Sequence, residues 1–240
     1  MNLSVYPDAS HANAAAADWL AGALVAPGVR TLMVAAGNTP LDLYRLISGR
    51  RLDLRHLHVF VLDEYVGVPL EEPRNCANLL REYVQRPWGI PEAQFHALSS
   101  LEADAVECVA RHEQRIEAMG GLDVLILGLG QNGHVGFNEP GSDAHDPGRL
   151  LELEPISIEA NRKWFHGVHA PAKGVTTGMP TLLNSRETLV LAYGPHKTSA
   201  VHAMVEGPIG PQCPASWLRH SPSVRLYLDT PAAAGLTRHP

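Results

Sequence analysis

Short apolar runs alternate with longer amphipathic stretches along most of this chain. The runs have the length and composition of buried strands, whereas the stretches repeat apolar residues at helical spacing. The pattern predicts strands at 31–36, 58–62, 122–127, 151–158, 174–177, 187–193 and 224–228. It predicts helices at 10–25, 40–47, 75–85, 102–119, 160–165, 179–183, 195–205 and 215–219.

Strands that are separated by helices imply crossover connections, which join parallel strands. The predicted fold class is therefore α/β: a Rossmann-like, doubly wound, mostly parallel sheet flanked by helices. A length of 240 residues fits one large domain better than two equal ones. We predict a single domain over residues 1–240, with frayed ends at 1–7 and 230–240.

The charge balance limits the class of partner. The chain has 19 Lys and Arg against 25 Asp and Glu, a formal net charge of −6, and no run of basic residues. A protein that binds nucleic acid without reading its sequence needs a concentrated basic face. We therefore predict no nucleic-acid partner, although a local anion site needs only a few cations.

Export and membrane insertion are not indicated. The Ala-rich stretch 12–26 is interrupted by Asp18 and follows no basic segment, and no apolar run is long enough for a bilayer span. The three cysteines, Cys76, Cys108 and Cys213, are widely spaced, which argues against a disulfide framework or a metal cluster. We expect a cytoplasmic protein with free thiols and no membrane partner.

Candidate catalytic residues gather in a glycine-rich loop after the predicted strand at 122–127. Glycine enters positive-φ conformations cheaply, so the loop from 128 onward is irregular. It carries Asn132, His134 and Glu139. A carboxylate or an amide can fix the tautomer and orientation of an imidazole. Open α/β sheets place their active sites beyond the C-terminal ends of strands, so this trio is either catalytic or an ordinary loop cluster.

A further carboxylate follows another predicted strand. Asp63 comes directly after 58–62, where it is either the cap of a turn or a general base presented at the end of the strand. Glu64 should face the other way, because neighbouring residues in a strand point to opposite sides.

Two predicted helix starts are candidate anion sites. Gly37, Asn38 and Thr39 lie between a strand and a helix, with Thr39 as the expected N-cap and Pro40 at the first helical position. Free N–H groups at such a start bind phosphate. Lys197 is expected in the first turn of a later helix, where a cation opposes the macrodipole unless an anion is near. A capped turn and a solvated lysine are the alternatives.

Motifs for cofactors and metals are missing. The chain has no Gly-x-Gly-x-x-Gly that opens a helix, no Walker lysine and no Gly-x-Ser-x-Gly elbow. No His or Cys spacing is typical of a metal site. The sequence therefore predicts no nucleotide cofactor and no metal.

Together, the motifs resemble the glucosamine-6-phosphate deaminase (isomerase) family, within the glucosamine-6-phosphate isomerase/6-phosphogluconolactonase superfamily. The most specific segment is Gly-His-Val-Gly-Phe-Asn-Glu-Pro-Gly at 133–141. The matching segments follow the family's order: 35–41, 62–67, 128–142, 174–183, 194–197 and 205–207. The related lactonases share the fold and the Gly-His but lack the Phe-Asn-Glu-Pro continuation, so they are the weaker match.

The resemblance implies a cofactor-free aldose–ketose isomerisation with loss of ammonia, most simply from glucosamine 6-phosphate to fructose 6-phosphate. His134, paired with Glu139 and Asn132, would move the proton that opens the pyranose ring. Asp63 would take the proton from C2 and return it at C1, which requires a base within hydrogen-bond reach and away from bulk water.

A small-molecule phosphosugar is thus the implied partner. Gly37, Asn38, Thr39 and Lys197 would hold its phosphate, and that binding energy would keep C1 and C2 in place.

The chain departs from the family pattern at positions that affect this site. The family's phosphate-binding arginine aligns with Lys163, one place after Arg162, and either cation could serve. Asn38 replaces the usual serine or glycine, and Asn132 stands where many members have aspartate. These departures leave the preferred hexosamine 6-phosphate open.

Two other functions stay open at this point. A lactonase or a non-deaminating phosphosugar isomerase would use the same fold. A non-catalytic sugar-phosphate sensor would have no reason to keep Asp63, His134 and Glu139 together. Family members include hexamers and monomers, so the sequence does not decide whether the protein forms a homo-oligomer.

Overall fold

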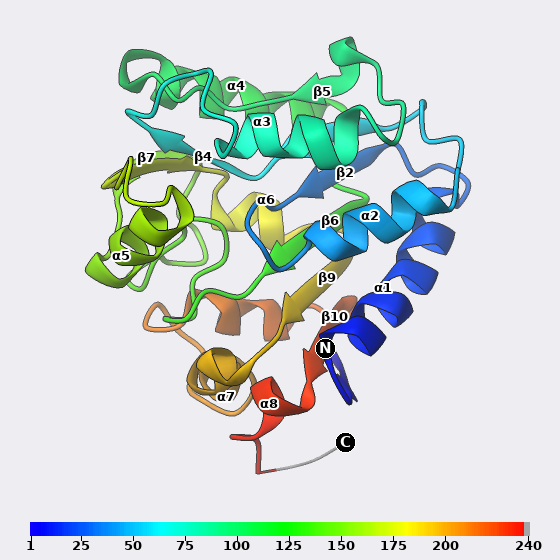
Figure 1. Cartoon of the computed structure of the whole chain (residues 1–240), viewed down its shortest axis with the longest axis vertical. Coiled ribbons are helices and arrows are strands. Elements are labelled where there is room, and N and C mark those ends of the chain that lie inside the picture. The colour runs from blue at the N-terminus through cyan, green and yellow to red at the C-terminus, as the bar shows by residue number, and fades with distance from the viewer. Residues whose placement is uncertain (238–240) are drawn as a thin grey trace.

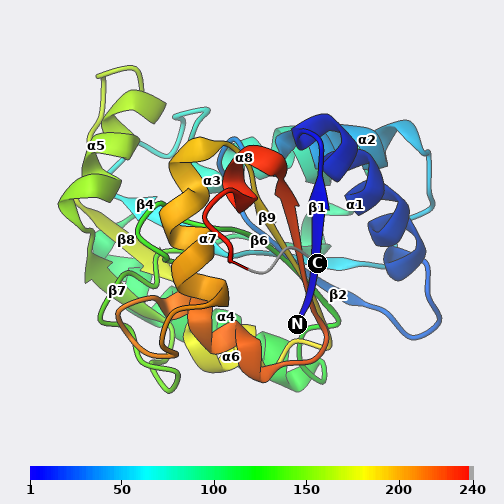
Figure 2. The ribbon, with the colours of Figure 1, turned by 90° about the horizontal axis from the view of Figure 1, so that it is seen from below.

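The computed structural model describes residues 1–237. Within these residues, a seven-stranded sheet runs through the molecule with helices on both of its faces (Figures 1 and 2). A three-stranded sheet lies beside it, near α5 (Pro155–Trp164). The predicted fold class, a doubly wound and mostly parallel α/β sheet in one domain, is confirmed.

All neighbouring strands of the large sheet are parallel, as crossover helices require. Its order is β1 (Asn2–Tyr6), β10 (Val224–Asp229), β9 (Glu187–Ala192), β6 (Val124–Gly128), β2 (Thr31–Val34), β3 (His58–Val61) and β5 (Phe95–His96). From β2 the chain builds the sheet in one direction, and from β6 it builds it in the other. The topological switch point therefore lies between β2 and β6, where such sheets bind their ligands.

The three-stranded sheet is antiparallel. It has the order β4 (Asp63–Val66), β8 (Lys173–Thr176) and β7 (Arg149–Glu152). The chain passes from β3 directly into β4, and Asp63 pairs with Thr176. Asp63 thus begins a strand of the small sheet, rather than following the end of the preceding strand as a free turn residue.

The remaining elements are helices. They are α1 (Ala9–Leu24), α2 (Leu41–Gly49), α3 (Cys76–Leu80), α4 (Glu102–Ala118), α5, α6 (Met179–Leu183), α7 (Thr198–Val205) and α8 (Thr230–Ala233). A π-helical turn, Arg81–Gln85, continues α3, and 3₁₀ turns cover Glu92–Gln94, Pro195–Lys197 and Pro214–His220. No helix among residues 1–237 combines the length and the apolar character of a membrane span.

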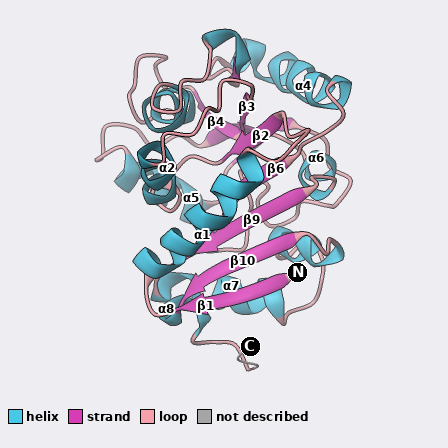
Figure 3. Cartoon of the chain, turned by 90° about the vertical axis from the view of Figure 1, so that its right-hand side faces the viewer, coloured by secondary structure: helices cyan, strands magenta, loops and turns pink. Residues whose placement is uncertain are grey.

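Each face of the large sheet has its own apolar core. One core packs the buried faces of α1, α2 and α3 against alternate residues of β2, β3 and β6. The other packs α6, α7 and α8 against the opposite residues of the same strands and of β10. Figure 3 shows α1 in front of β9 and β10 and α7 behind them. Because both faces are covered, the central strands read as continuous apolar runs.

Two predictions of secondary structure are wrong. The strand predicted at 151–158 ends at Glu152, and α5 begins at Pro155, because the fixed φ of proline suits the first turn of a helix. The segment 1–7, predicted to be frayed, contains β1, whose Leu3 and Val5 pack on the second core.

The other end is also more ordered than predicted. In the segment 230–240, Thr230–Ala233 forms α8, and the Asp229 side chain caps this helix by accepting from the Ala232 N–H at 2.9 Å. Residues 238–240 lie outside the described residues, so the prediction is not tested there.

Candidate active site

A cavity of about 310 Å³ opens at the switch point, beyond the C-terminal ends of β2 and β6. Its walls come from the loops that follow these two strands, from the start of β4, from the turn before α7 and from one face of α5. Six of the predicted site residues line it: Gly37, Asn38, Thr39, Asp63, His134 and Lys197. Parts of the chain that are far apart in sequence therefore converge on one space.

Glu139 and Asn132 hold the imidazole of His134. The Nδ1 atom of His134 lies 3.1 Å from Glu139 Oε2, and Asn132 Nδ2 donates to the same oxygen at 2.7 Å. The His134 backbone N–H donates to Asn132 Oδ1 at 3.3 Å. An ionised carboxylate only accepts, so Nδ1 carries the proton and Nε2 is left as the basic nitrogen. The predicted trio is thus one hydrogen-bonded unit.

Glycine is needed beside this ring. A Cβ atom on Gly130 would lie 2.2 Å from His134 Cδ2, so any side chain there would displace the imidazole. The Gly130 N–H also donates to the His134 carbonyl at 2.9 Å, which closes the loop on itself. The glycines of this loop therefore set the position of the ring.

The carboxyl group of Glu139 is buried but ionised. Burial alone would raise its pKa, yet the hydrogen bond from His134, the charge of that ring and the further donors around it bring the pKa of Glu139 below its ordinary value. At neutral pH the carboxylate can therefore orient the imidazole and stabilise it when it takes up a proton.

Asp63 is a buried carboxyl group on the wall of the same cavity. Burial raises the pKa of Asp63 to about 7, the charge of Glu64 adds to the increase, and a hydrogen bond from the Cys76 thiol opposes it. A carboxylate with a raised pKa is a stronger base than one in water, which suits it to take a proton from carbon.

Glu64 points away from the cavity, as predicted. Its carboxylate accepts from the backbone N–H groups of Tyr65, Cys76 and Ala77, at 2.8, 3.0 and 2.8 Å. Burial raises the pKa of Glu64, and these three donors oppose that rise. Glu64 thus ties β4 to the start of α3 and has a structural role.

Lys197 brings a cation to the cavity. The sequence predicted it in the first turn of a helix; in the structure it ends a 3₁₀ turn and is the residue before α7. Its Nζ donates to the Leu129 carbonyl at 2.6 Å, and burial lowers the pKa of Lys197 to about 8. Burial disfavours the charged form of this ammonium group, and an anionic ligand beside it would stabilise that charge.

The loop at 37–39 also lines the cavity, with Gly37 at a φ of +93°. The predicted cap is wrong in detail. The helix α2 begins at Leu41, Pro40 is the capping residue, and Thr39 makes no side-chain capping bond. The hydroxyl of Tyr44 donates to the Ala35 carbonyl at 2.8 Å, which fixes the base of the loop.

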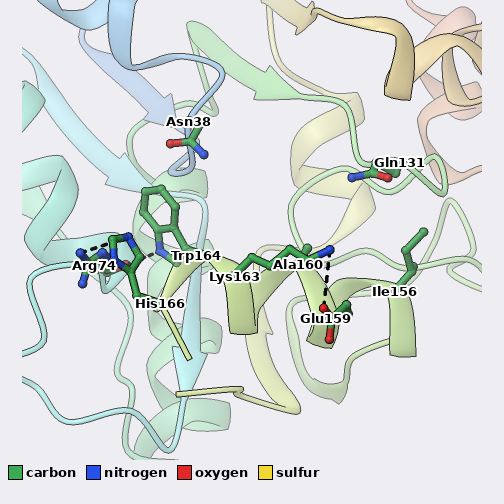
Figure 4. Close-up of a pocket in the computed structure, with 9 residues that line it drawn as sticks. All are labelled: Asn38, Arg74, Gln131, Ile156, Glu159, Ala160, Lys163, Trp164 and His166. Carbon is green, nitrogen blue, oxygen red and sulfur yellow. Dashed lines mark hydrogen bonds and ion pairs between the residues drawn. The ribbon is translucent and has the colours of Figure 1, made fainter. Parts of the chain in front are cut away.

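Arg162 and Lys163 are placed differently from each other. Both are exposed near the end of α5 and lie 3.6 and 3.5 Å from Glu159. Lys163 lines an adjoining pocket of about 390 Å³ that shares Asn38 with the main cavity, whereas Arg162 lines neither of the two spaces. Figure 4 shows Lys163 turned toward Glu159.

This chain matches the model of one protein family, glucosamine-6-phosphate isomerases/6-phosphogluconolactonase, over residues 8–227. The chain belongs to this family.

Relatives within the family have similar lengths. The glucosamine-6-phosphate deaminase of Cutibacterium acnes is 35% identical over 242 residues, covering 99% of this chain and 93% of the relative. That of Streptomyces coelicolor is 33% identical over 242 residues, covering 98% and 93%.

Solved structures agree with the fold. A monomeric glucosamine-6-phosphate deaminase superimposes with a TM-score of 0.93 at 26% identity, covering 98% of this chain and 100% of the other. The 6-phosphogluconolactonase of Trypanosoma cruzi has a TM-score of 0.81 at 20% identity, with 99% and 97% covered, which shows a shared fold only.

This family member has cavity residues that the sequence did not single out. Ser157, Asn161 and Trp164 follow one face of α5 at helical spacing and line the cavity. Ser157 was missed because 151–158 was predicted as a strand, so its helical spacing with Asn161 and Trp164 was not recognised. Trp164 is fixed by its indole N–H, which donates to the Arg74 carbonyl at 3.0 Å.

Proposed function

We propose that this protein is a glucosamine-6-phosphate deaminase, which converts glucosamine 6-phosphate and water into fructose 6-phosphate and ammonia. The observation that carries the proposal is the convergence of Asp63, the His134–Glu139 pair and Lys197 on one cavity. Relatives with this activity in their names, at up to 35% identity over nearly the whole chain, support it.

The first step is the opening of the pyranose ring. The Nε2 atom of His134 accepts the proton of the O1 hydroxyl, the C1–O5 bond breaks to give the aldehyde, and the proton passes to O5. Glu139 stabilises the transient imidazolium, because its carboxylate lies against Nδ1. Asn132 keeps that carboxylate in place.

The second step moves a proton between carbons. The Asp63 carboxylate removes the C2 proton and O1 gains a proton, which gives an enolamine. Asp63 then delivers its proton to C1 while the nitrogen lone pair forms the C2=N bond, which leaves a protonated ketimine at C2 with O1 retained as the C1 hydroxyl. Water adds to C2 and ammonia leaves, so the ketose forms. The raised pKa of Asp63, about 7, makes this carboxylate basic enough to compete for the proton near neutral pH.

The phosphate supplies binding energy that keeps C1 and C2 beside these groups. We infer that the loop at Gly37, Asn38 and Thr39 holds it together with Lys197, whose charge a phosphate would stabilise in its half-buried setting. Lys163 is a candidate for a further contact from α5, because it lines the pocket next to Asn38. Arg162 is the weaker candidate.

The test is ammonia release by the purified protein in a coupled assay. We expect equal amounts of ammonia and fructose 6-phosphate from glucosamine 6-phosphate, and a much lower rate with unphosphorylated glucosamine. Galactosamine 6-phosphate and mannosamine 6-phosphate, assayed in parallel, define which hexosamine is preferred. Hydrolysis of 6-phosphogluconolactone without any ammonia from the three amino sugars would identify a lactonase and overturn the proposal.

The expected setting is the cytoplasm. Phosphosugars are metabolised there, and a reducing compartment keeps the three free cysteines as thiols. Fractionation of cells that produce the protein at its natural level would test this.

A further inference from the structure

One oxygen of the catalytic glutamate is left without a partner. Glu139 Oε2 is engaged by His134 and Asn132, but Oε1 is buried and, within residues 1–237, meets no hydrogen-bond donor at normal distance. The residue as a whole is only 4% exposed. A buried carboxylate oxygen without a donor is costly, so its surroundings call for an explanation.

A second unpartnered group lies beside it. The hydroxyl of Ser157 is buried, and no hydrogen-bond partner for it is found in the described part of the chain. Ser157 is 5% exposed and lines the substrate cavity from the first turn of α5. The two groups are close enough for this hydroxyl to contribute to the lowered pKa of Glu139, although they do not form a hydrogen bond of ordinary geometry.

We propose that Ser157 is a positioning residue for the His134–Glu139 pair, and that its hydroxyl donates to Glu139 Oε1 once α5 packs against a bound phosphosugar. This proposal rests on the function proposed above. Asn161 and Trp164 lie on the same face of α5 and line the same cavity, so a substrate that contacts them sets the distance from Ser157 to Glu139.

The consequence concerns the ring-opening step. With a donor on each oxygen, the carboxylate cannot rotate, and Oε2 stays against His134 Nδ1. Without the Ser157 hydroxyl, the carboxylate can turn to satisfy Oε1, and the imidazole loses its fixed orientation. Substrate affinity should change little, because Ser157 is not among the groups that hold the phosphate.

The experiment compares Ser157→Ala with Ser157→Thr, which keeps a hydroxyl. For Ser157→Ala we expect kcat to fall about tenfold, in keeping with a hydrogen bond to a charged group. KM and the affinity for 2-amino-2-deoxyglucitol 6-phosphate, an acyclic analogue of the substrate, should stay within about twofold. The acid limb of the pH profile should move to higher pH, because Glu139 loses a donor that favours its ionised form. Ser157→Thr should restore both kcat and the position of the acid limb of the pH profile.

A measurement without turnover separates this proposal from the proposed function. Titration of the Glu139 carboxyl carbon by ¹³C NMR, with saturating 2-amino-2-deoxyglucitol 6-phosphate and assigned with Glu139→Gln, should show a higher pKa in Ser157→Ala than in the wild type and in Ser157→Thr. Unchanged kcat, acid limb and Glu139 titration in Ser157→Ala would overturn the role of Ser157 in an active deaminase. If the wild type releases no ammonia, the proposed function fails, and the titration alone decides whether the two side chains interact.

Discussion

Replacing Asp63 with asparagine should make the protein less active and more stable at the same time. The side chain is buried on the cavity wall, and its pKa is raised to about 7, mainly by burial. Asparagine has nearly the same shape but cannot take a proton from C2. Loss of a general base typically slows turnover by about 10²- to 10⁴-fold, and we expect a decrease in kcat of that size with KM little changed.

The gain in stability follows from linkage. In the unfolded chain the carboxyl group of Asp63 ionises near pH 4, whereas in the folded protein it keeps its proton to about pH 7. Folding therefore binds a proton in this window, and the free energy of unfolding falls as pH rises from 4 to 7. A span of about three pH units corresponds to about 4 kcal/mol, a loss that Asp63→Asn does not suffer. For a protein of this size that is roughly 10 °C in Tm.

The assay pairs turnover with thermal melts of the wild type and Asp63→Asn at pH 4.5 and pH 8. The matched control is Glu64→Gln, which alters the neighbouring buried carboxylate. Glu64 accepts three backbone N–H bonds that one amide oxygen cannot all replace, so Glu64→Gln should lose stability. Because burial also raises the pKa of Glu64, to about 7, this loss should be smaller at pH 8 than at pH 4.5. An Asp63→Asn protein with more than about a tenth of wild-type turnover, or with a stability advantage that does not grow with pH, would refute the reasoning.

Two further predictions concern the other groups in the cavity. His134→Gln should lower turnover by about 10²-fold or more but leave binding of the acyclic analogue 2-amino-2-deoxyglucitol 6-phosphate unchanged, because that compound needs no ring opening. Equal losses in turnover and binding would contradict the role of His134. The KM of the wild type should rise as pH passes about 8, where Lys197 loses its charge. Lys197→Met should have a KM about tenfold higher than the wild type at pH 7, and this KM should not rise further as pH passes 8. Lys163→Met is the control, with a smaller effect expected from its exposed position; a larger effect there would place the phosphate at α5.

The parts of this molecule that depend on local pattern could be predicted from the sequence. The apolar runs and the amphipathic helices between them predicted the parallel sheet. Gly128 and the residues after it predicted the loop that holds His134. The trio of Asn132, His134 and Glu139 could be foreseen because its members lie within a few residues of one another.

What depends on tertiary contacts could not be foreseen. Asp63 acquires its raised pKa mainly from burial, which the sequence does not show, and only the smaller contribution from Glu64 comes from a neighbour in the chain. β1 was missed because its order comes from tertiary contacts: it pairs with β10, and Leu3 and Val5 pack on the second core. The strand predicted at 151–158 fails because its alternating apolar residues also suit a short strand followed by a helix that begins at Pro155. That error hid Ser157 on the inner face of α5.

The central claim is that one fixed carboxylate moves a proton between C2 and C1 of a phosphosugar held in this cavity. The most direct measurement is the conversion of glucosamine 6-phosphate in ²H₂O, with NMR analysis of the two hydrogens at C1 of the product. A single base on one side of the substrate delivers one hydrogen to C1, which is either the proton taken from C2 or a deuteron that Asp63 has exchanged with the solvent. Any deuterium should therefore occupy only one of the two C1 positions of fructose 6-phosphate, and Asp63→Asn should form product at least about 10²-fold more slowly. Deuterium spread over both C1 positions, or product formed by Asp63→Asn at the wild-type rate, would contradict the account.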